Sequence, residues 1–135
     1  MRTLVAMLML GGLVGCASVP DERIAIATDK SNILDKNITE YREGTGKVVF
    51  KRDSWPMHAY RIDVYFDGRK LGSIGGGEIL TAYLPSGRHL FGTQTVENRP
   101  SREIAAEISD KKTTYIHLTL SAWGWGGWDI SETSY

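Results

Sequence analysis

The strongest constraint on the fold is the alternation of apolar and polar residues in short runs. The run "YRIDVYF" at 60–66 places Ile62, Val64 and Phe66 at every second position. A period of two is that of a β-strand, because successive side chains of a strand point to opposite faces. We therefore expect these three side chains to point into a core.

Similar runs rich in Val, Ile, Tyr, Phe and Thr recur along the chain, separated by Gly, Asp and Pro. Short strands at such regular spacing are typical of an all-β domain. The predicted strands are 47–52, 60–66, 69–74, 78–84, 88–97, 102–109 and 113–121. A single sheet leaves one face uncovered, so six or seven strands of this length predict a small antiparallel β-sandwich over residues 46–135.

Turn residues punctuate the strands at fixed places. Asp67-Gly68 is a dipeptide preferred in tight hairpins, where both central positions take positive φ, and Pro85 and Gly87 surround a second turn before His89. The rhythm "IDVYFDGRKLGSI" followed by "ILTAYLPSGRHLF" resembles PEGA-type repeats, and also a small domain of unknown function common in bacterial lipoproteins. The resemblance covers roughly residues 47–120. It implies an immunoglobulin-like or PEGA-like sandwich in the cell envelope, and it supplies no catalytic residues to carry over to this chain.

The N-terminal residues predict export. Arg2 precedes the apolar stretch 4–14, which is too short and too glycine-broken to span a bilayer. Residues 13–16, "LVGC", resemble the lipobox of bacterial lipoproteins. The resemblance implies that residues 1–15 form a cleaved signal peptide and that the Cys16 thiol forms a thioether with a lipid, after which the new amino terminus is acylated, for example with palmitate. The alternative is an ordinary secreted protein with one stray thiol.

The residues after the lipobox predict a cellular location and a tether. Inner-membrane lipoproteins commonly resemble one another in carrying Asp after the cysteine, whereas Ala17 and Ser18 follow here. We therefore expect a lipid anchor on the periplasmic face of the outer membrane. Residues 16–45 are polar and mixed in charge, with "IAIA" at 24–27 as one short apolar cluster. They predict a tether that lifts the domain off the membrane, with or without one short element packed against the domain.

Composition limits the partners. The chain has 16 Lys and Arg against 16 Asp and Glu, and removal of the leader takes away only Arg2. A nucleic-acid-binding protein normally shows an excess of basic residues, so no nucleic-acid partner is expected. Cys16 is the only cysteine, which excludes a disulfide within the chain and a zinc site built on several thiolates.

The segment 121–135 is the most unusual part of the sequence. Trp123, Trp125 and Trp128 lie within six residues and are separated by glycines. Aromatic rings beside small residues suit stacking on a sugar, contact with a partner or a place at a lipid interface. The other interpretation is that these rings close one end of the sandwich.

No catalytic or metal-binding motif is evident. His58, His89 and His117 are scattered, although His89 and His117 fall on strands where they could be neighbours, and "GSIGGGE" at 72–78 lacks the helix that a phosphate loop requires. No G-x-S-x-G motif occurs, and no metal or other cofactor is expected. We therefore expect a non-catalytic interaction or structural module. Peptidoglycan recognition through the tryptophan segment is the alternative, and a hydrolase assembled only by folding is a third reading.

Overall fold

The computed structural model describes residues 21–54, 60–94, 102–120 and 128–133. The predicted signal peptide, Cys16, Trp123 and Trp125 lie outside these ranges, and so does His58. Helical structure in the described residues is limited to two 3-10 turns, η1 (Lys30–Asn32) and η2 (Lys36–Thr39).

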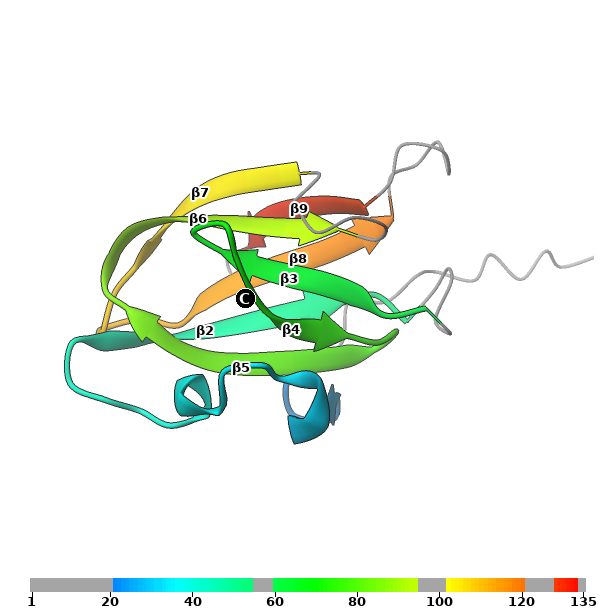
Figure 1. Cartoon of the computed structure of the whole chain (residues 1–135), viewed down its shortest axis with the longest axis horizontal. Helices are drawn as coiled ribbons and strands as arrows, with labels where there is room; N and C mark the ends of the chain where they lie inside the picture. The colour runs from blue at the N-terminus through cyan, green and yellow to red at the C-terminus, as the bar shows by residue number, and fades with distance from the viewer. Residues whose placement is uncertain (1–20, 55–59, 95–101, 121–127, 134–135) are drawn as a thin grey trace, which may run out of the picture.

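The described strands form two sheets packed face to face, which confirms the predicted β-sandwich (Figure 1). The first sheet has the order β1-β5-β2-β8-β9 and the second has the order β4-β3-β6-β7. The strands are β1 (Ile26–Ala27), β2 (Thr45–Arg52), β3 (Ile62–Phe66), β4 (Arg69–Ile74), β5 (Glu78–Pro85), β6 (Gly87–Gln94), β7 (Arg102–Ile108), β8 (Thr114–Leu120) and β9 (Trp128–Thr133).

The count and direction of the strands differ from the prediction in detail. Nine strands are described, because β1 and β9 add to the seven predicted runs. Most pairs are antiparallel as expected, but β1 pairs with β5 and β2 pairs with β8 in parallel. A parallel neighbour needs a long connection, and β2 and β8 are indeed separated by the whole second sheet along the chain.

The core lies between the sheets and follows the predicted alternation. Ile62, Val64 and Phe66 are all buried, and Ile116 and Leu118 of β8 are fully buried. Phe66 packs on Phe91 of the neighbouring strand with ring centroids 5.6 Å apart. The predicted orientation of these strands is therefore confirmed.

The turn after β3 has the geometry expected of Asp-Gly. Asp67 and Gly68 have φ values of 47° and 76°. The Asp67 carboxylate also accepts the Leu90 N–H at 2.9 Å and contacts His89 Nδ1 at 2.7 Å. The residues that carry the PEGA-type resemblance therefore include a turn that is fastened to the next strand of its sheet.

Residues 21–45, which the sequence analysis assigns to a tether, pack against the sandwich over much of their length. Ile33 and Ile38 are buried members of the core. β1 pairs with the beginning of β5, and Ile33 forms an isolated bridge with Gly72 of β4. The packed part of the chain thus begins well before the predicted domain boundary at residue 46.

Candidate functional site

Strand ends of both sheets lie at one end of the sandwich. In the first sheet Arg52 pairs with Leu118 and Leu120 pairs with Trp128. In the second sheet Asp63 pairs with Gln94. We call this the loop end, and it comprises the residues where β2, β6 and β8 finish and where β3, β7 and β9 begin (Figure 1): Arg52, Gln94, Leu120, Ile62, Arg102 and Trp128.

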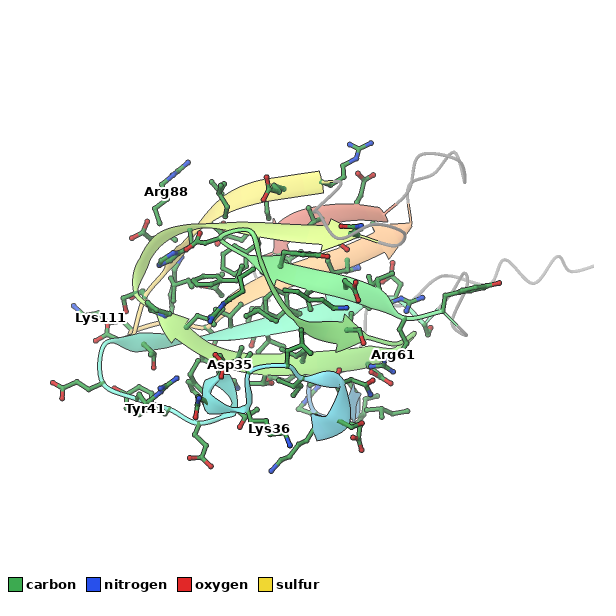
Figure 2. The ribbon with its side chains drawn as sticks, viewed as in Figure 1. Asp35, Lys36, Tyr41, Arg61, Arg88 and Lys111 are labelled. Carbon is green, nitrogen blue, oxygen red and sulfur yellow. The ribbon has the colours of Figure 1, made fainter. Side chains whose placement is uncertain are left out.

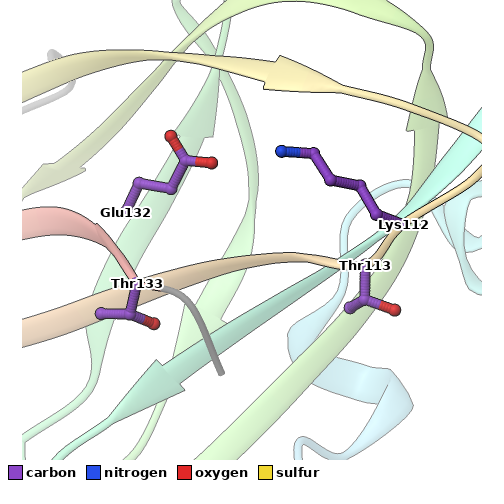
Figure 3. Close-up of a pocket in the computed structure, with 4 residues that line it drawn as sticks. All are labelled: Lys112, Thr113, Glu132 and Thr133. Carbon is purple, nitrogen blue, oxygen red and sulfur yellow. The ribbon is translucent and has the colours of Figure 1, made fainter.

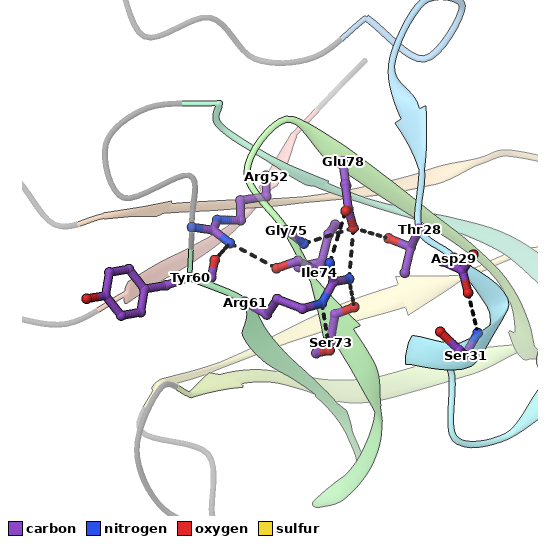
Figure 4. A network of polar contacts seen from close by, with 10 residues as sticks. All are labelled: Thr28, Asp29, Ser31, Arg52, Tyr60, Arg61, Ser73, Ile74, Gly75 and Glu78. Carbon is purple, nitrogen blue, oxygen red and sulfur yellow. Dashed lines mark hydrogen bonds and ion pairs between the residues drawn. The ribbon is translucent and has the colours of Figure 1, made fainter.

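Arg52 is fully buried at the loop end and connects the two sheets. It follows Val48 and Phe50 at alternate positions of β2, so its side chain points inward between the sheets. Its guanidinium donates to the carbonyl oxygen of Ile74 at 3.0 Å and to that of Tyr60 (Figure 4). Burial lowers the pKa of Arg52 to about 10, so the group remains a cation at neutral pH.

A second arginine, Arg61, lies nearer the surface of the same region and links β4 to β5. Arg61 forms two hydrogen bonds with the Glu78 carboxylate, at 3.0 and 2.9 Å, and donates to the Ser73 carbonyl at 2.8 Å (Figure 4). Glu78 also accepts the Gly75 N–H and the Thr28 hydroxyl. Burial acts to raise the pKa of Glu78, but the bonds from Arg61 and Gly75 outweigh it, and the pKa lies below its ordinary value.

Asp53, the next residue after Arg52, points to the opposite face and anchors a third set of contacts. Its carboxylate is 2.7 Å from His117 Nε2 and accepts the Thr119 hydroxyl at 2.7 Å. Burial acts to raise the pKa of Asp53, but the bonds from His117 and Thr119 outweigh it and the net shift is downward. Because an ionised carboxylate only accepts, the Nε2 atom of His117 carries the hydrogen. The Asp53 carbonyl accepts the Gly77 N–H at 3.2 Å, which joins this cluster to the β4–β5 turn.

Gln94 adds a polar group without a partner. It ends β6 and is buried, and among the described residues neither its amide oxygen nor its amide nitrogen has a hydrogen-bond partner. Buried polar groups are nearly always satisfied in folded proteins. The loop end therefore combines a fixed polar framework with an amide that retains capacity for a further hydrogen bond.

The histidines do not assemble into a catalytic or metal-binding group in the described residues. His89 and His117 lie in different sheets, so the expectation that they could be neighbours is wrong. Each contacts one carboxylate, Asp67 or Asp53, and in the described ranges no hydroxyl or thiol is hydrogen-bonded to either imidazole. The same ranges contain no group of three or more His, Cys, Asp or Glu placed to hold a metal ion.

Of the predicted site residues, Trp128 is the one that lies within the described ranges. Trp123 and Trp125 lie outside the described residues, as does Cys16. Trp128 begins β9 and pairs with Leu120 through the backbone. The backbone pairing therefore brings Leu120 and Trp128 together at the loop end.

Sequence reasoning missed the charged residues that build the loop end. The signal was present for Arg52, because it continues the inward alternation of Val48 and Phe50, and a charge at such a position predicts a buried polar contact. Asp53 and His117 gave no such signal. They lie 64 positions apart and meet only because β2 pairs with β8.

A surface hollow lies at the other end of β8 and β9. It measures about 530 Å³ and is lined by Lys112, Thr113, Glu132 and Thr133 (Figure 3). The Lys112 and Glu132 side chains extend toward each other across it. The hollow is open to solvent and is lined by charged residues and threonines, so it lacks the enclosure typical of a small-molecule site.

Comparison with models of protein families, with curated proteins and with solved structures finds no match to this chain. None of the described segments forms an apolar helix of the length needed to cross a bilayer.

Proposed function

We propose that this chain is a non-catalytic lipoprotein of the bacterial cell envelope, anchored through Cys16 and presenting the loop end to a partner. The lipobox-like "LVGC" at 13–16 supports the anchor. The residues after it favour the periplasmic face of the outer membrane. The PEGA-like resemblance is consistent with this location.

The framework at the loop end is the observation that carries the interaction role. Arg52 joins the two sheets, and Asp53 holds the ends of β2 and β8 together. A sandwich whose strand ends are fixed in this way can present connecting segments in a defined geometry, and such segments carry binding in many β-sandwiches. The unsatisfied amide of Gln94 lies in the same region.

Peptidoglycan is the second candidate partner. Trp128 pairs through the backbone with Leu120, the neighbour of Thr119, whose hydroxyl is bound to Asp53. Sugar sites commonly combine an aromatic ring that stacks on the sugar with polar groups that bind its hydroxyls. The sequence around Trp123 and Trp125 supplies the rings, and the loop end supplies the polar groups.

The anchor is tested by metabolic labelling with a fatty-acid probe. Wild-type protein should incorporate the probe, and Cys16→Ser should not, because serine cannot form the thioether. Met57→Ser, which leaves Cys16 intact, is the control and should label like the wild type. Equal labelling of wild type and Cys16→Ser would overturn the lipoprotein assignment.

The loop end is tested by sedimentation of the full chain with isolated peptidoglycan. Trp125→Ala should reduce the sedimented fraction at least tenfold while leaving the melting temperature near that of the wild type. Leu90→Ala, on the exposed side of β6, is the matched control and should sediment normally. Absence of binding by the wild type would exclude the peptidoglycan reading, and release of soluble sugar fragments would contradict the non-catalytic assignment.

A further inference from the structure

The beginning of the described chain is fastened to the outer face of the first sheet. Glu22 accepts from Lys47 Nζ at 2.6 Å and from the Tyr115 hydroxyl at 2.9 Å, and it thereby contacts both β2 and β8. The Ile24 and Ala25 N–H groups donate to the Asp21 carbonyl and close a turn. The chain then enters β1 beside β5. Residue 22 is therefore a fixed point of the domain.

Large apolar side chains are exposed directly after this fixed point. We call residues 24–41 the N-terminal margin, and Figure 1 shows η1 and η2 of this segment running along β5. Four of its side chains are mostly exposed: Ile24 84%, Ile26 69%, Leu34 65% and Tyr41 63%. Only two other large apolar side chains in the described residues are exposed, Tyr60 and Leu90. Exposed apolar side chains that gather along one edge of the molecule favour contact with an apolar surface.

The short chain length between Cys16 and Asp21 limits what the N-terminal margin can contact. Cys16 and Asp21 are five residue steps apart, so their Cα atoms lie at most about 18 Å apart at ~3.6 Å per residue. A tether running unpacked to residue 45 would reach roughly 100 Å by the same measure. The packing of Glu22 therefore holds the domain close to whatever Cys16 is attached to.

We infer that the N-terminal margin lies against the phospholipid bilayer, with Ile24 and Ile26 at the boundary of headgroups and acyl chains. This inference rests on the proposed lipid anchor at Cys16. Apolar side chains held near a bilayer by an anchor gain burial at that boundary. Lys30 and Lys36 are exposed in the same margin and can reach the phosphates. Asp29, Asp35 and Glu40 lie in the margin as well, so the apolar side chains and not the net charge carry the inference. Figure 2 shows Lys36 and Tyr41 on the side of the molecule opposite Arg88.

The test uses the full lipidated chain in vesicles of phosphatidylethanolamine and phosphatidylglycerol that contain nitroxide-labelled lipid. Cys16 is the only natural cysteine, and once it is a thioether a new cysteine is the one reactive thiol. A fluorophore is attached to Ile26→Cys, to Ile24→Cys as a second margin position and to Arg88→Cys as the control. We expect quenching at least threefold greater at positions 24 and 26 than at 88.

The outcomes separate this inference from the lipoprotein assignment. If the protein does not float with the vesicles, the anchor fails and the margin inference fails with it. If the protein floats but quenching at 24 and 26 equals that at 88, only the margin inference is overturned. A blue-shifted emission at 26 without quenching would mean that a protein surface, such as a second copy of this chain, covers the margin, and would also overturn it.

Discussion

Tyr115 donates its hydroxyl hydrogen to Glu22 at 2.9 Å, although the two residues are 93 positions apart in the sequence. Glu22 precedes the first described strand, whereas Tyr115 lies in β8, so this contact closes the N-terminal segment onto the sheet. Lys47 Nζ binds the same carboxylate at 2.6 Å. The hydrogen bond from Lys47 and that from Tyr115 lower the pKa of Glu22.

Glu22→Gln should loosen the N-terminal segment without unfolding the sandwich. The side chains are partly exposed, and solvent screening limits the loss to about 1 kcal/mol or less. Amide hydrogen exchange of residues 24–28 should become several-fold faster, while exchange in β3 and β6 stays unchanged. Asp21→Asn is the control, because within the described part of the chain the hydrogen bonds of the Asp21 side chain go to nearby Arg23. Equal exchange in wild type and Glu22→Gln would show that other contacts hold the segment.

Gly72→Ala should displace residues 32–33, where the N-terminal segment packs against β4. A Cβ atom at position 72 would lie 2.4 Å from the Asn32 carbonyl oxygen and 3.2 Å from Ile33 Cα, so the backbone of the segment must move. We expect a loss of about 1–3 kcal/mol in the free energy of unfolding and faster exchange around residue 33. Gly68→Ala, which has open space but a φ of 76°, should lose about 1 kcal/mol without affecting exchange there.

The strands were predictable because their alternation is local. Ile62, Val64 and Phe66 needed only a period of two, and the Asp67-Gly68 turn needed only its own dipeptide. The packing of residues 21–45 was not predictable in this way, because the pattern of Ile33, Leu34 and Ile38 does not say which side chains are buried: Ile33 and Ile38 join the core, whereas Leu34 is exposed.

β9 and the contact between Asp53 and His117 could not be predicted from the sequence for a different reason. β9 contains glycine-flanked and polar residues, and it becomes a strand by pairing with the exposed edge of β8. Asp53 and His117 are brought together by the parallel pairing of β2 with β8, which no local pattern encodes. Long-range pairing therefore accounts for what sequence reasoning missed.

Phe66→Ala should be strongly destabilising. The ring is buried and packs 5.6 Å from Phe91 and 4.7 Å from His89, measured between centroids. Truncation of a core phenylalanine costs about 3–5 kcal/mol because it leaves a cavity. Urea denaturation measures the loss. Tyr60→Ala removes an exposed ring and should change the free energy of unfolding by less than about 0.5 kcal/mol. A loss below ~1 kcal/mol for Phe66→Ala would contradict the packing described.

A double-mutant cycle on Asp53→Asn and His117→Gln should reveal coupling between the two side chains. Both are largely buried and their contact is 2.7 Å long, so we expect a coupling free energy of about 1–2 kcal/mol. The matched cycle on Asp67→Asn and His89→Gln has the same contact distance but a more exposed carboxylate. It should give roughly half a kcal/mol. Equal coupling in the two cycles would mean that burial at the loop end adds no strength to the contact.

Acid should destabilise the protein through its paired carboxylates. The pKa values of Glu22, Asp53 and Glu78 lie below their ordinary values of 4.5, 3.8 and 4.5 in the folded protein. A carboxyl group with a lowered folded pKa stabilises the fold above its ordinary pKa, and this contribution is lost as the pH falls through the folded value. The free energy of unfolding should therefore be nearly constant from about pH 7 to 5 and fall below about pH 4.5.

Glu78→Gln identifies one source of this acid sensitivity. The substitution removes the ion pair with Arg61, whose side chain is about one-third exposed, and after solvent screening it should cost about 1 kcal/mol at neutral pH. The difference from wild type should shrink as the pH falls through the lowered folded pKa of Glu78, because the carboxyl group then becomes protonated in both the folded and the unfolded chain. Glu103→Gln, an exposed substitution on β7, should follow the wild-type pH profile. A difference between wild type and Glu78→Gln that stays constant from neutral pH to pH 3 would show that the side chain acts through packing rather than through its charge.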